Sequence, residues 1–137
     1  MLLQIVDLSA LLLDQQNEFN GLLHLLVALR STLMHRCELV KYHGHSLVLR
    51  RSTELKLVGL CDADWAIDPD DRRSTSSYCL YFGENLVSWH SKKQHTVSRS
   101  STEAEHRSLA NLVAKITWVQ SLLTEIRVNL SDTPTVW

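Results

Sequence analysis

Residues 100–126 read SSTEAEHRSLANLVAKITWVQSLLTEI, and this stretch decides the fold. Its apolar residues recur with the 3.6-residue period of an amphipathic helix that buries one face. They are Leu109, Leu112, Val113, Ile116, Val119, Leu123 and Ile126. Two overlapping Ser/Thr-x-x-Glu patterns, Ser100 with Glu103 and Thr102 with Glu105, are capping-box signatures at the helix start. The sequence therefore predicts one long packing helix over residues 100–126.

The two glutamates at the start of this helix are predicted to face different ways. At ~100° per residue, Glu105 lies about 40° from Leu109, inside the apolar stripe, and Glu103 lies roughly 120° from Leu109 towards solvent. Because an unpaired buried carboxylate is unfavourable, Glu105 needs a cation, a hydrogen-bond donor or a metal ion. The alternative is that Glu105 is the exposed capping-box glutamate, favoured there by the helix dipole.

Two further acids follow an apolar strand that is predicted for residues 55–61. Since side chains alternate along a strand, Asp62 shares a face with Val58, and Asp64 joins them if the strand continues. Acids at this spacing repel each other and have no local cation, so divalent metal binding through oxygen ligands explains them. The alternative is an Asp-rich turn, which is the stronger interpretation for residues 68–71.

An antiparallel hairpin is predicted between this strand and the helix. Residues 78–82 and 86–91 are rich in aromatic and β-branched side chains, and residues 83–85 connect them. Lys92, Lys93 and Arg99 then cluster in the polar link into the helix, where they could contact phosphates. Solvated surface side chains are the alternative interpretation of these three residues.

The two ends of the chain carry weaker signals. Residues 1 to about 40 are helical by pattern, residues 42–45 predict a turn, and residues 46–49 predict a short strand. Beyond the long helix, Pro134 marks a loop and residues 135–137 start a further strand. We therefore predict a helical extension over residues 1–45 and one α/β domain over residues 46–137.

Composition excludes several classes of protein. The 137 residues are 45% hydrophobic with a net charge of −1, so nucleic-acid contacts must come from a local basic patch. The three cysteines have no C-x-x-C spacing, which indicates reduced cysteines in an intracellular protein. The histidines have no acidic or cysteine partners at ligand spacing, so we expect them not to bind metal. The Leu-rich N-terminus is a poor signal peptide and too short for a spanning helix, so we expect no membrane contact.

Four blocks of sequence follow one another between residues 57 and 105: LVGLCDADWA (57–66), DDRRSTS (70–76), VSW (87–89) with SKKQ (91–94), and VSRSSTEAE (97–105). In this order they closely resemble the ribonuclease H domain at the C-terminal end of copia-type retrotransposon Pol polyproteins. The resemblance covers about residues 46–137. It implies a partial ribonuclease H-like α/β fold, with a mixed sheet, an antiparallel hairpin and one long packing helix, but without the later strands and helices.

The resemblance also implies a function. Enzymes of that family cleave the RNA strand of RNA–DNA hybrids, as part of a larger Pol polyprotein, with two Mg²⁺ ions held by acidic residues. Carried over by motif, the catalytic and metal-binding acids are Asp62 and Glu105, and Asp64 is a further candidate ligand. Lys92, Lys93 and Arg99 would then face the backbone of the hybrid, where charge gives sequence-independent affinity.

The chain departs from the family at three places. The family continues past the position of Trp137 with a Cys-Asp-Asn-like segment whose Asp is a metal ligand, and a further acid follows. His106 stands where the family has an aromatic residue, and residues 1–40 do not match the reverse-transcriptase connection. We therefore expect a truncated fragment that is inactive as this chain. The alternatives are a non-catalytic RNA- or hybrid-binding module and a non-functional pseudogene product.

Overall fold

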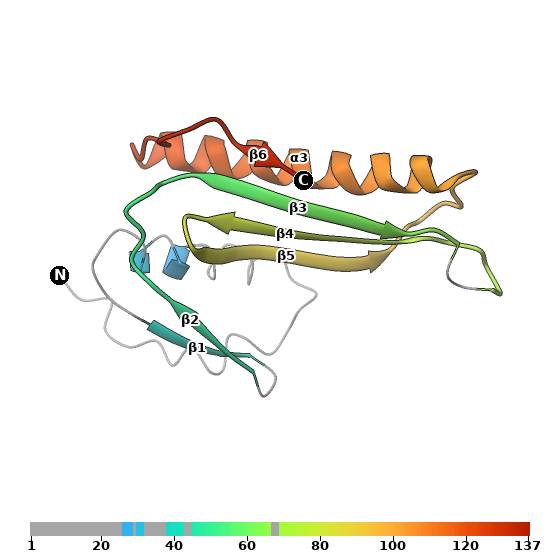
Figure 1. Ribbon diagram of the computed structural model, residues 1–137, viewed down its shortest axis with the longest axis horizontal. Helices are drawn as coiled ribbons and strands as arrows, with labels where there is room; N and C mark the ends of the chain where they lie inside the picture. Colours follow the sequence, from blue (N-terminus) through green and yellow to red (C-terminus); the bar gives the residue numbers. More distant parts are fainter. Residues whose placement is uncertain (1–25, 29, 32–37, 43–44, 67–68) are drawn as a thin grey trace.

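The computed structural model describes residues 26–28, 30–31, 38–42, 45–66 and 69–137. The described residues form a two-stranded sheet, a four-stranded sheet and one long helix, α3 (Ser101–Glu125) (Figure 1). The small sheet pairs β1 (Glu38–Tyr42) with β2 (His45–Leu49). The larger sheet, in the order β5–β4–β3–β6, contains β3 (Leu57–Asp64), β4 (Thr75–Phe82), β5 (Asn85–Lys93) and β6 (Thr135–Val136).

The larger sheet is mixed. Strands β3, β4 and β5 are antiparallel neighbours, whereas β6 runs parallel to β3, with Val136 paired to Gly59. The turn between β4 and β5 places Gly83 at φ +59°, a conformation that glycine adopts without a steric penalty. The prediction of an α/β fold with a mixed sheet, an antiparallel hairpin and one long helix is confirmed.

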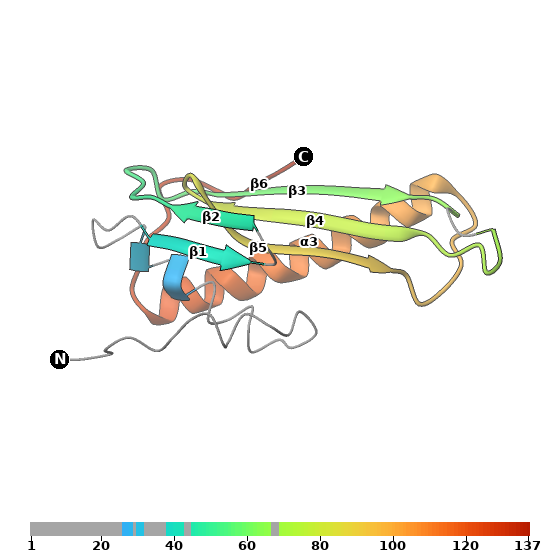
Figure 2. The same cartoon turned by 90° about the horizontal axis from the view of Figure 1, so that it is seen from below.

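Helix α3 covers one face of the larger sheet, and the β1–β2 hairpin lies on the opposite side near the β4–β5 turn (Figures 1 and 2). The helix comes close to β3 at Gly59, where an added Cβ would lie 2.8 Å from a methyl carbon of Leu112. A glycine at this position therefore lets the helix and the central strand approach each other.

The apolar core lies between α3 and the sheet. Burial of each large apolar side chain stabilises the fold by roughly 1.5–3 kcal/mol. From the sheet it takes Leu57, Leu80, Phe82 and Val87, and from the helix Leu112, Ile116, Val119 and Leu123. Leu49 of β2 is also fully buried in this cluster, so the β1–β2 hairpin is anchored to the same core.

The predicted apolar stripe of α3 is partly wrong. Leu109, Val113 and Ile126 are 36–46% exposed. The buried residues are Ala104, Ser108, Leu112, Ile116, Val119 and Leu123. The first four follow one another at intervals of four residues, so the contact row moves around the helix as it crosses the twisted sheet. A straight stripe centred on the leucines and valines therefore misplaces the contact face at the start of the helix.

The N-terminal part also differs from expectation. Residues 26–28 and 30–31 are helical, but residues 38–40, expected to be helical, belong to β1. The rest of the predicted helical region lies outside the described residues. The strand predicted at residues 46–49 is confirmed as β2. Strands β1 and β2 pair with each other across the predicted boundary between residues 45 and 46. The division of the chain into a helical extension and an α/β domain stays a prediction.

Candidate functional site

A cavity of about 490 Å³ lies where β3, α3 and β6 meet. The two acidic residues predicted to act together, Asp62 from β3 and Glu105 from α3, both line this cavity. The other lining residues are Cys61, His106, Leu109, Val136 and Trp137. The fold thus brings to one place two acids that are 43 residues apart in the sequence, between positions 62 and 105.

Strand β3 positions Asp62. The strand continues to Asp64, so both acids lie on the same, exposed face, as the sequence predicted for a continued strand. The backbone N–H of Ala63 donates a 2.9 Å hydrogen bond to Oδ1 of Asp62 and orients the carboxylate. Asp64 is exposed but does not line the cavity, so its metal-ligand role stays a prediction.

Glu105 is exposed, which corrects the prediction that it points into the helix–sheet contact. Its position relative to Asp62 is fixed instead by Ser108, three residues later on the buried face of α3. The Ser108 hydroxyl donates to the backbone oxygens of Asp62 at 2.8 Å and of Ser77 at 3.1 Å. This hydroxyl ties the first turns of α3 to the part of β3 that carries Asp62.

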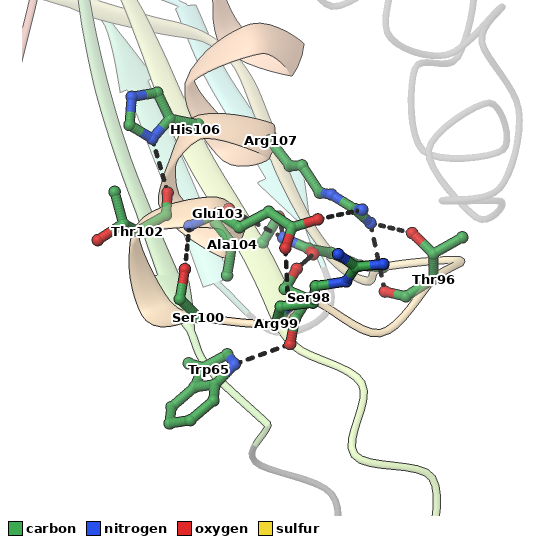
Figure 3. A network of polar contacts seen from close by, with 12 residues as sticks. Trp65, Thr96, Ser98, Arg99, Ser100, Thr102, Glu103, Ala104, His106 and Arg107 are labelled. Carbon is green, nitrogen blue, oxygen red and sulfur yellow. Dashed lines mark hydrogen bonds and ion pairs between the residues drawn. The ribbon is translucent and has the colours of Figure 1, made fainter.

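Glu103, and not Glu105, is the glutamate that is bonded to the N-cap of α3. Ser100 is the N-cap, and its hydroxyl accepts a 3.2 Å hydrogen bond from the Glu103 backbone N–H. The Glu103 carboxylate accepts from the backbone N–H of Arg99 at 2.8 Å and pairs with Arg107 at 2.6 Å (Figure 3). These donors, the Arg99 N–H first, hold the pKa of Glu103 below its ordinary value. Glu105 is therefore not the capping glutamate.

Among the described residues, neither Asp62 nor Glu105 takes part in an ion pair, whereas Glu54, Asp71 and Glu103 do. That same part of the chain contains no group of three or more His, Cys, Asp or Glu side chains that could hold a metal ion. The described residues therefore offer a pair of carboxylates, whose oxygens are the ligands that Mg²⁺ prefers.

The three predicted nucleic-acid-binding residues do not line the cavity. Lys92 and Lys93 lie at the end of β5 and not in the link, which corrects the prediction, and both are exposed. The Lys93 ammonium pairs with Asp71 at 3.1 Å, so part of its charge is neutralised. Arg99 is exposed in the link that precedes α3. A role for these residues in binding nucleic acid stays a prediction.

A buried polar network holds this link, and sequence reasoning missed it (Figure 3). The Gln94 side-chain amide donates to the Ser76 hydroxyl at 2.6 Å and to the Ala104 backbone oxygen at 3.0 Å. Its oxygen accepts a 2.9 Å hydrogen bond from Ser98. The indole N–H of Trp65 donates to the Ser98 backbone oxygen at 3.1 Å. Periodicity carries no signal for such contacts, although Gln94 stands inside one of the four matching sequence blocks.

Cys61 and Cys79 are free thiols, and Cys37 lies outside the described residues. Burial, followed by the charge of Asp62, raises the pKa of the Cys61 thiol, so this thiol in the cavity wall favours its protonated form. None of the described helices is both long and apolar enough to cross a membrane.

Comparison with known proteins identifies relatives of this chain. It is 47% identical over 93 residues to the retrovirus-related Pol polyprotein from transposon RE2 of Arabidopsis thaliana, and 46% identical over 94 residues to that from transposon RE1. These matches cover 68% and 69% of this chain but only 6% of each polyprotein. An uncharacterized mitochondrial protein of the same plant is 46% identical over 74 residues, which are 54% of this chain and 31% of that protein.

No protein-family model and no solved structure matches the chain. The curated relatives nevertheless relate it to a segment of retrotransposon Pol polyproteins, and in those relatives the matching segment is a small part of a much larger protein.

Proposed function

We propose that the cavity between Asp62 and Glu105 is the metal-binding site of a ribonuclease H-type centre, which acts on the RNA strand of an RNA–DNA hybrid. The observation that carries this proposal is that two acidic residues, Asp62 from a central strand and Glu105 from the helix packed on it, line one cavity. The relationship to Pol polyproteins supports it, because hybrid hydrolysis is the activity that the motif resemblance implies.

The chemistry of the donors fits Mg²⁺. This ion keeps several of its waters and is commonly held by one or two carboxylates together with substrate phosphates. Asp62 and Glu105 supply hard oxygen ligands beside an open cavity. Bound Mg²⁺ would supply water activation and neutralisation of charge on the leaving oxygen.

The side chains of this chain have separate tasks in the proposal. The Asp62 and Glu105 carboxylates hold the ions, and Ser108 maintains the spacing between their two elements. Lys92 and Arg99, both exposed, attract the phosphate backbone of the hybrid. Lys93 contributes less, because Asp71 already pairs with it.

The pairing register between β6 and β3 also supports a metal site at Asp62. The Trp137 backbone N–H donates to Gly59 at 2.9 Å, and the Cys61 N–H donates to Trp137 at 3.1 Å. With Val136 level with Gly59, a residue two places beyond Trp137 in a strand that keeps this register is level with Asp62. The family's Cys-Asp-Asn-like segment would put its metal-binding Asp at that level.

A cleavage assay tests the proposal. We expect the 137-residue chain to cleave a labelled RNA–DNA hybrid poorly in Mg²⁺, because a pair of carboxylates binds two ions weakly. The same chain extended by Cys-Asp-Asn should cleave faster, and Asp62→Asn or Glu105→Gln in the extended chain should abolish the gain. Glu125→Gln, an exposed acid at the far end of α3, is the matched control and should leave activity unchanged.

One result would count against the proposal, and another against the expectation that the unextended chain is inactive. Cleavage by the extended chain that persists in Asp62→Asn would remove the metal role of the cavity. Robust cleavage by the unextended chain that Asp62→Asn abolishes would keep the centre but refute the expectation that this chain is inactive.

A non-catalytic hybrid-binding module is the second candidate function. It is favoured by the exposed Lys92 and Arg99, together with a site that offers only a pair of acidic residues among the described residues. Binding to the hybrid should then weaken steeply with salt, with a slope that falls by about one for each phosphate-contacting residue removed. Salt-insensitive binding, or no binding at low salt, would eliminate this alternative.

A further inference from the structure

Trp65 is an exposed aromatic residue in the turn that follows β3, three positions beyond Asp62. Its side chain is 46% exposed, although the turn carries it next to the segment that leads into α3. Single exposed apolar residues are common on protein surfaces and need no function by themselves. The surroundings of Trp65 distinguish it from such a residue.

The ring of Trp65 is fixed in place. Its N–H donates to the Ser98 backbone oxygen at 3.1 Å, and the Ser98 hydroxyl donates to the buried amide of Gln94 at 2.9 Å. Gln94 in turn bonds to β4 through Ser76 and to α3 through Ala104. Figure 3 shows the indole N–H directed at this network, while none of the other labelled side chains covers the ring. An exposed ring held this firmly loses little conformational freedom when a flat group packs on it.

A cation stands next to the point where Trp65 is anchored. Arg99 follows Ser98 directly and is exposed, and its backbone N–H is bound to the Glu103 carboxylate at 2.8 Å. Arg107 forms the ion pair with Glu103, and no ion pair within the described residues involves the Arg99 side chain. An immobilised aromatic ring anchored at Ser98, with an exposed arginine as the next residue, can accept two parts of one nucleotide, a flat base or sugar and a phosphate.

The nearby acids limit which partner fits this surface. Asp62 and Asp64 are exposed on the strand that leads to Trp65, and they would repel a phosphate unless a divalent cation lies between them and the strand of nucleic acid. A nucleic-acid strand that crosses the metal site would satisfy this condition. A plain acidic peptide or an anionic lipid surface would bring negative charge without such a bridge.

We propose that Trp65 and Arg99 form a nucleotide-binding platform beside the cavity, on which a base or sugar of the bound strand packs against the indole while its phosphate meets the guanidinium. This inference rests on the proposed function, because it assumes that the strand passes over the Asp62–Glu105 cavity. The Trp65 contact belongs neither to the acidic motif nor to the basic cluster, and it gives Arg99 of that cluster a defined neighbour.

Tryptophan fluorescence tests the platform directly. The chain has four tryptophans, and Trp118 is 42% exposed on α3, which makes it a matched control for Trp65 at 46%. One protein keeps Trp65 and replaces Trp89, Trp118 and Trp137 by Phe, and the other keeps Trp118 and replaces the remaining three. Each is titrated, in Mg²⁺ at low salt, with single-stranded DNA and with a hybrid whose RNA strand is 2′-O-methylated, so that no cleavage is involved.

The platform predicts saturable quenching of Trp65 and little change in Trp118. If both nucleic acids quench Trp65, the contact is a base or a sugar of either kind of strand. If only the hybrid does, the contact is the sugar edge of a duplex. In the otherwise unchanged chain, Trp65→Ala should weaken binding about fivefold or more, as expected for loss of one stacking contact. Trp65→Phe should retain most of the affinity, and Arg99→Gln should lower the salt slope by about one.

Unchanged Trp65 emission while fluorescence anisotropy of labelled nucleic acid reports binding would overturn the platform and leave the proposed function standing. Absence of binding to either nucleic acid would also overturn it. The proposed function fails separately, if Mg²⁺ binding followed by calorimetry is the same in Asp62→Asn as in the unchanged chain. Because the fluorescence titration retains Trp65, it does not depend on whether Trp65→Ala folds.

Discussion

The two ends of α3 are attached to the sheet in different ways. Towards the C-terminal end, Leu112, Ile116, Val119 and Leu123 are buried against apolar side chains of the sheet. Towards the N-terminal end the buried residues of the helix are Ala104 and Ser108, and hydrogen bonds make the contact with the sheet. We call these the apolar end and the polar end.

The difference separates stability from geometry. Apolar burial is strong but non-directional, so the apolar end stabilises the fold without fixing individual atoms. Hydrogen bonds contribute less to stability but demand defined distances and angles. The polar end therefore suits the place where Asp62 and Glu105 must keep a fixed spacing. Four substitutions test this division, beginning with the largest expected effect.

Phe82→Ala should give the greatest loss of stability. Phe82 is fully buried at the apolar end, and truncation of a buried Phe typically costs about 3–5 kcal/mol. Urea unfolding followed by circular dichroism measures the change. Val113→Ala, at a side chain that is 46% exposed on the same helix, is the control and should change stability by less than about 0.5 kcal/mol. Similar losses in both variants would contradict the assignment of the core.

Gln94→Ala tests the polar end. It removes the amide that links Ser76, Ser98 and Ala104, and the partners left unsatisfied should cost about 1–3 kcal/mol. The exposed Asn111→Ala on α3 serves as control. Trp65 should also become more mobile, which fluorescence anisotropy of its emission can detect. A stability loss as large as that of Phe82→Ala would break the comparison between the two ends.

Ser108→Ala should have a smaller effect on stability and a clear effect on the site. Loss of the hydroxyl that donates to the backbone oxygens of Asp62 and Ser77 is expected to cost about 1 kcal/mol. Mg²⁺ affinity, measured by calorimetry, should fall as well, because the spacing of Asp62 and Glu105 loosens. Ser121→Ala is matched, since that hydroxyl bonds only within the helix, to Thr117. Equal Mg²⁺ affinity in both variants would argue against a positioning role for Ser108.

Glu103→Gln should give the smallest and most pH-dependent change. The pKa of Glu103 is lowered in the folded protein, so its contribution to stability is present above the ordinary glutamate pKa and is lost as the pH falls through the lowered value. The variant should therefore be slightly less stable than the unchanged chain at neutral pH, and the difference should disappear in acid. Thermal unfolding across this pH range measures it. A difference that grows in acid would contradict the capping assignment.

Much of the fold could be predicted from the sequence because it depends on local patterns. The apolar run before Asp62 predicted β3, and the aromatic and β-branched residues around a short connection predicted the β4–β5 hairpin. The capping signature with the 3.6-residue period predicted the helix to within one residue at each end. The strand was predicted to end before Asp62, but β3 continues to Asp64, so Asp62 lies inside the strand and not at its tip. Residues 38–40 were predicted as helix and form part of β1, because pairing with β2 outweighed a weak local preference.

The site depends on contacts that local sequence patterns do not predict. The periodicity of large apolar residues gives no weight to Ala104 and Ser108, which are the buried residues at the start of α3. For that reason the sequence wrongly predicted that Glu105 faces the sheet. The hydrogen bonds of Gln94, Ser98 and Trp65 join residues that lie up to 33 positions apart, and no periodicity reports them.

The sequence by itself determined which residues are candidates for catalysis and binding. They are carboxylates that follow an apolar run and that begin a helix, with basic residues between them in the sequence. Only the tertiary structure decided that Asp62 and Glu105 line one cavity while Glu103 caps the helix. The physical reason is that hydrophobic periodicity fixes how each element turns about its own axis. The spacing between elements depends on side chains such as Gly59 and Ser108, whose small size and single hydroxyl act only when the partner strand is in place.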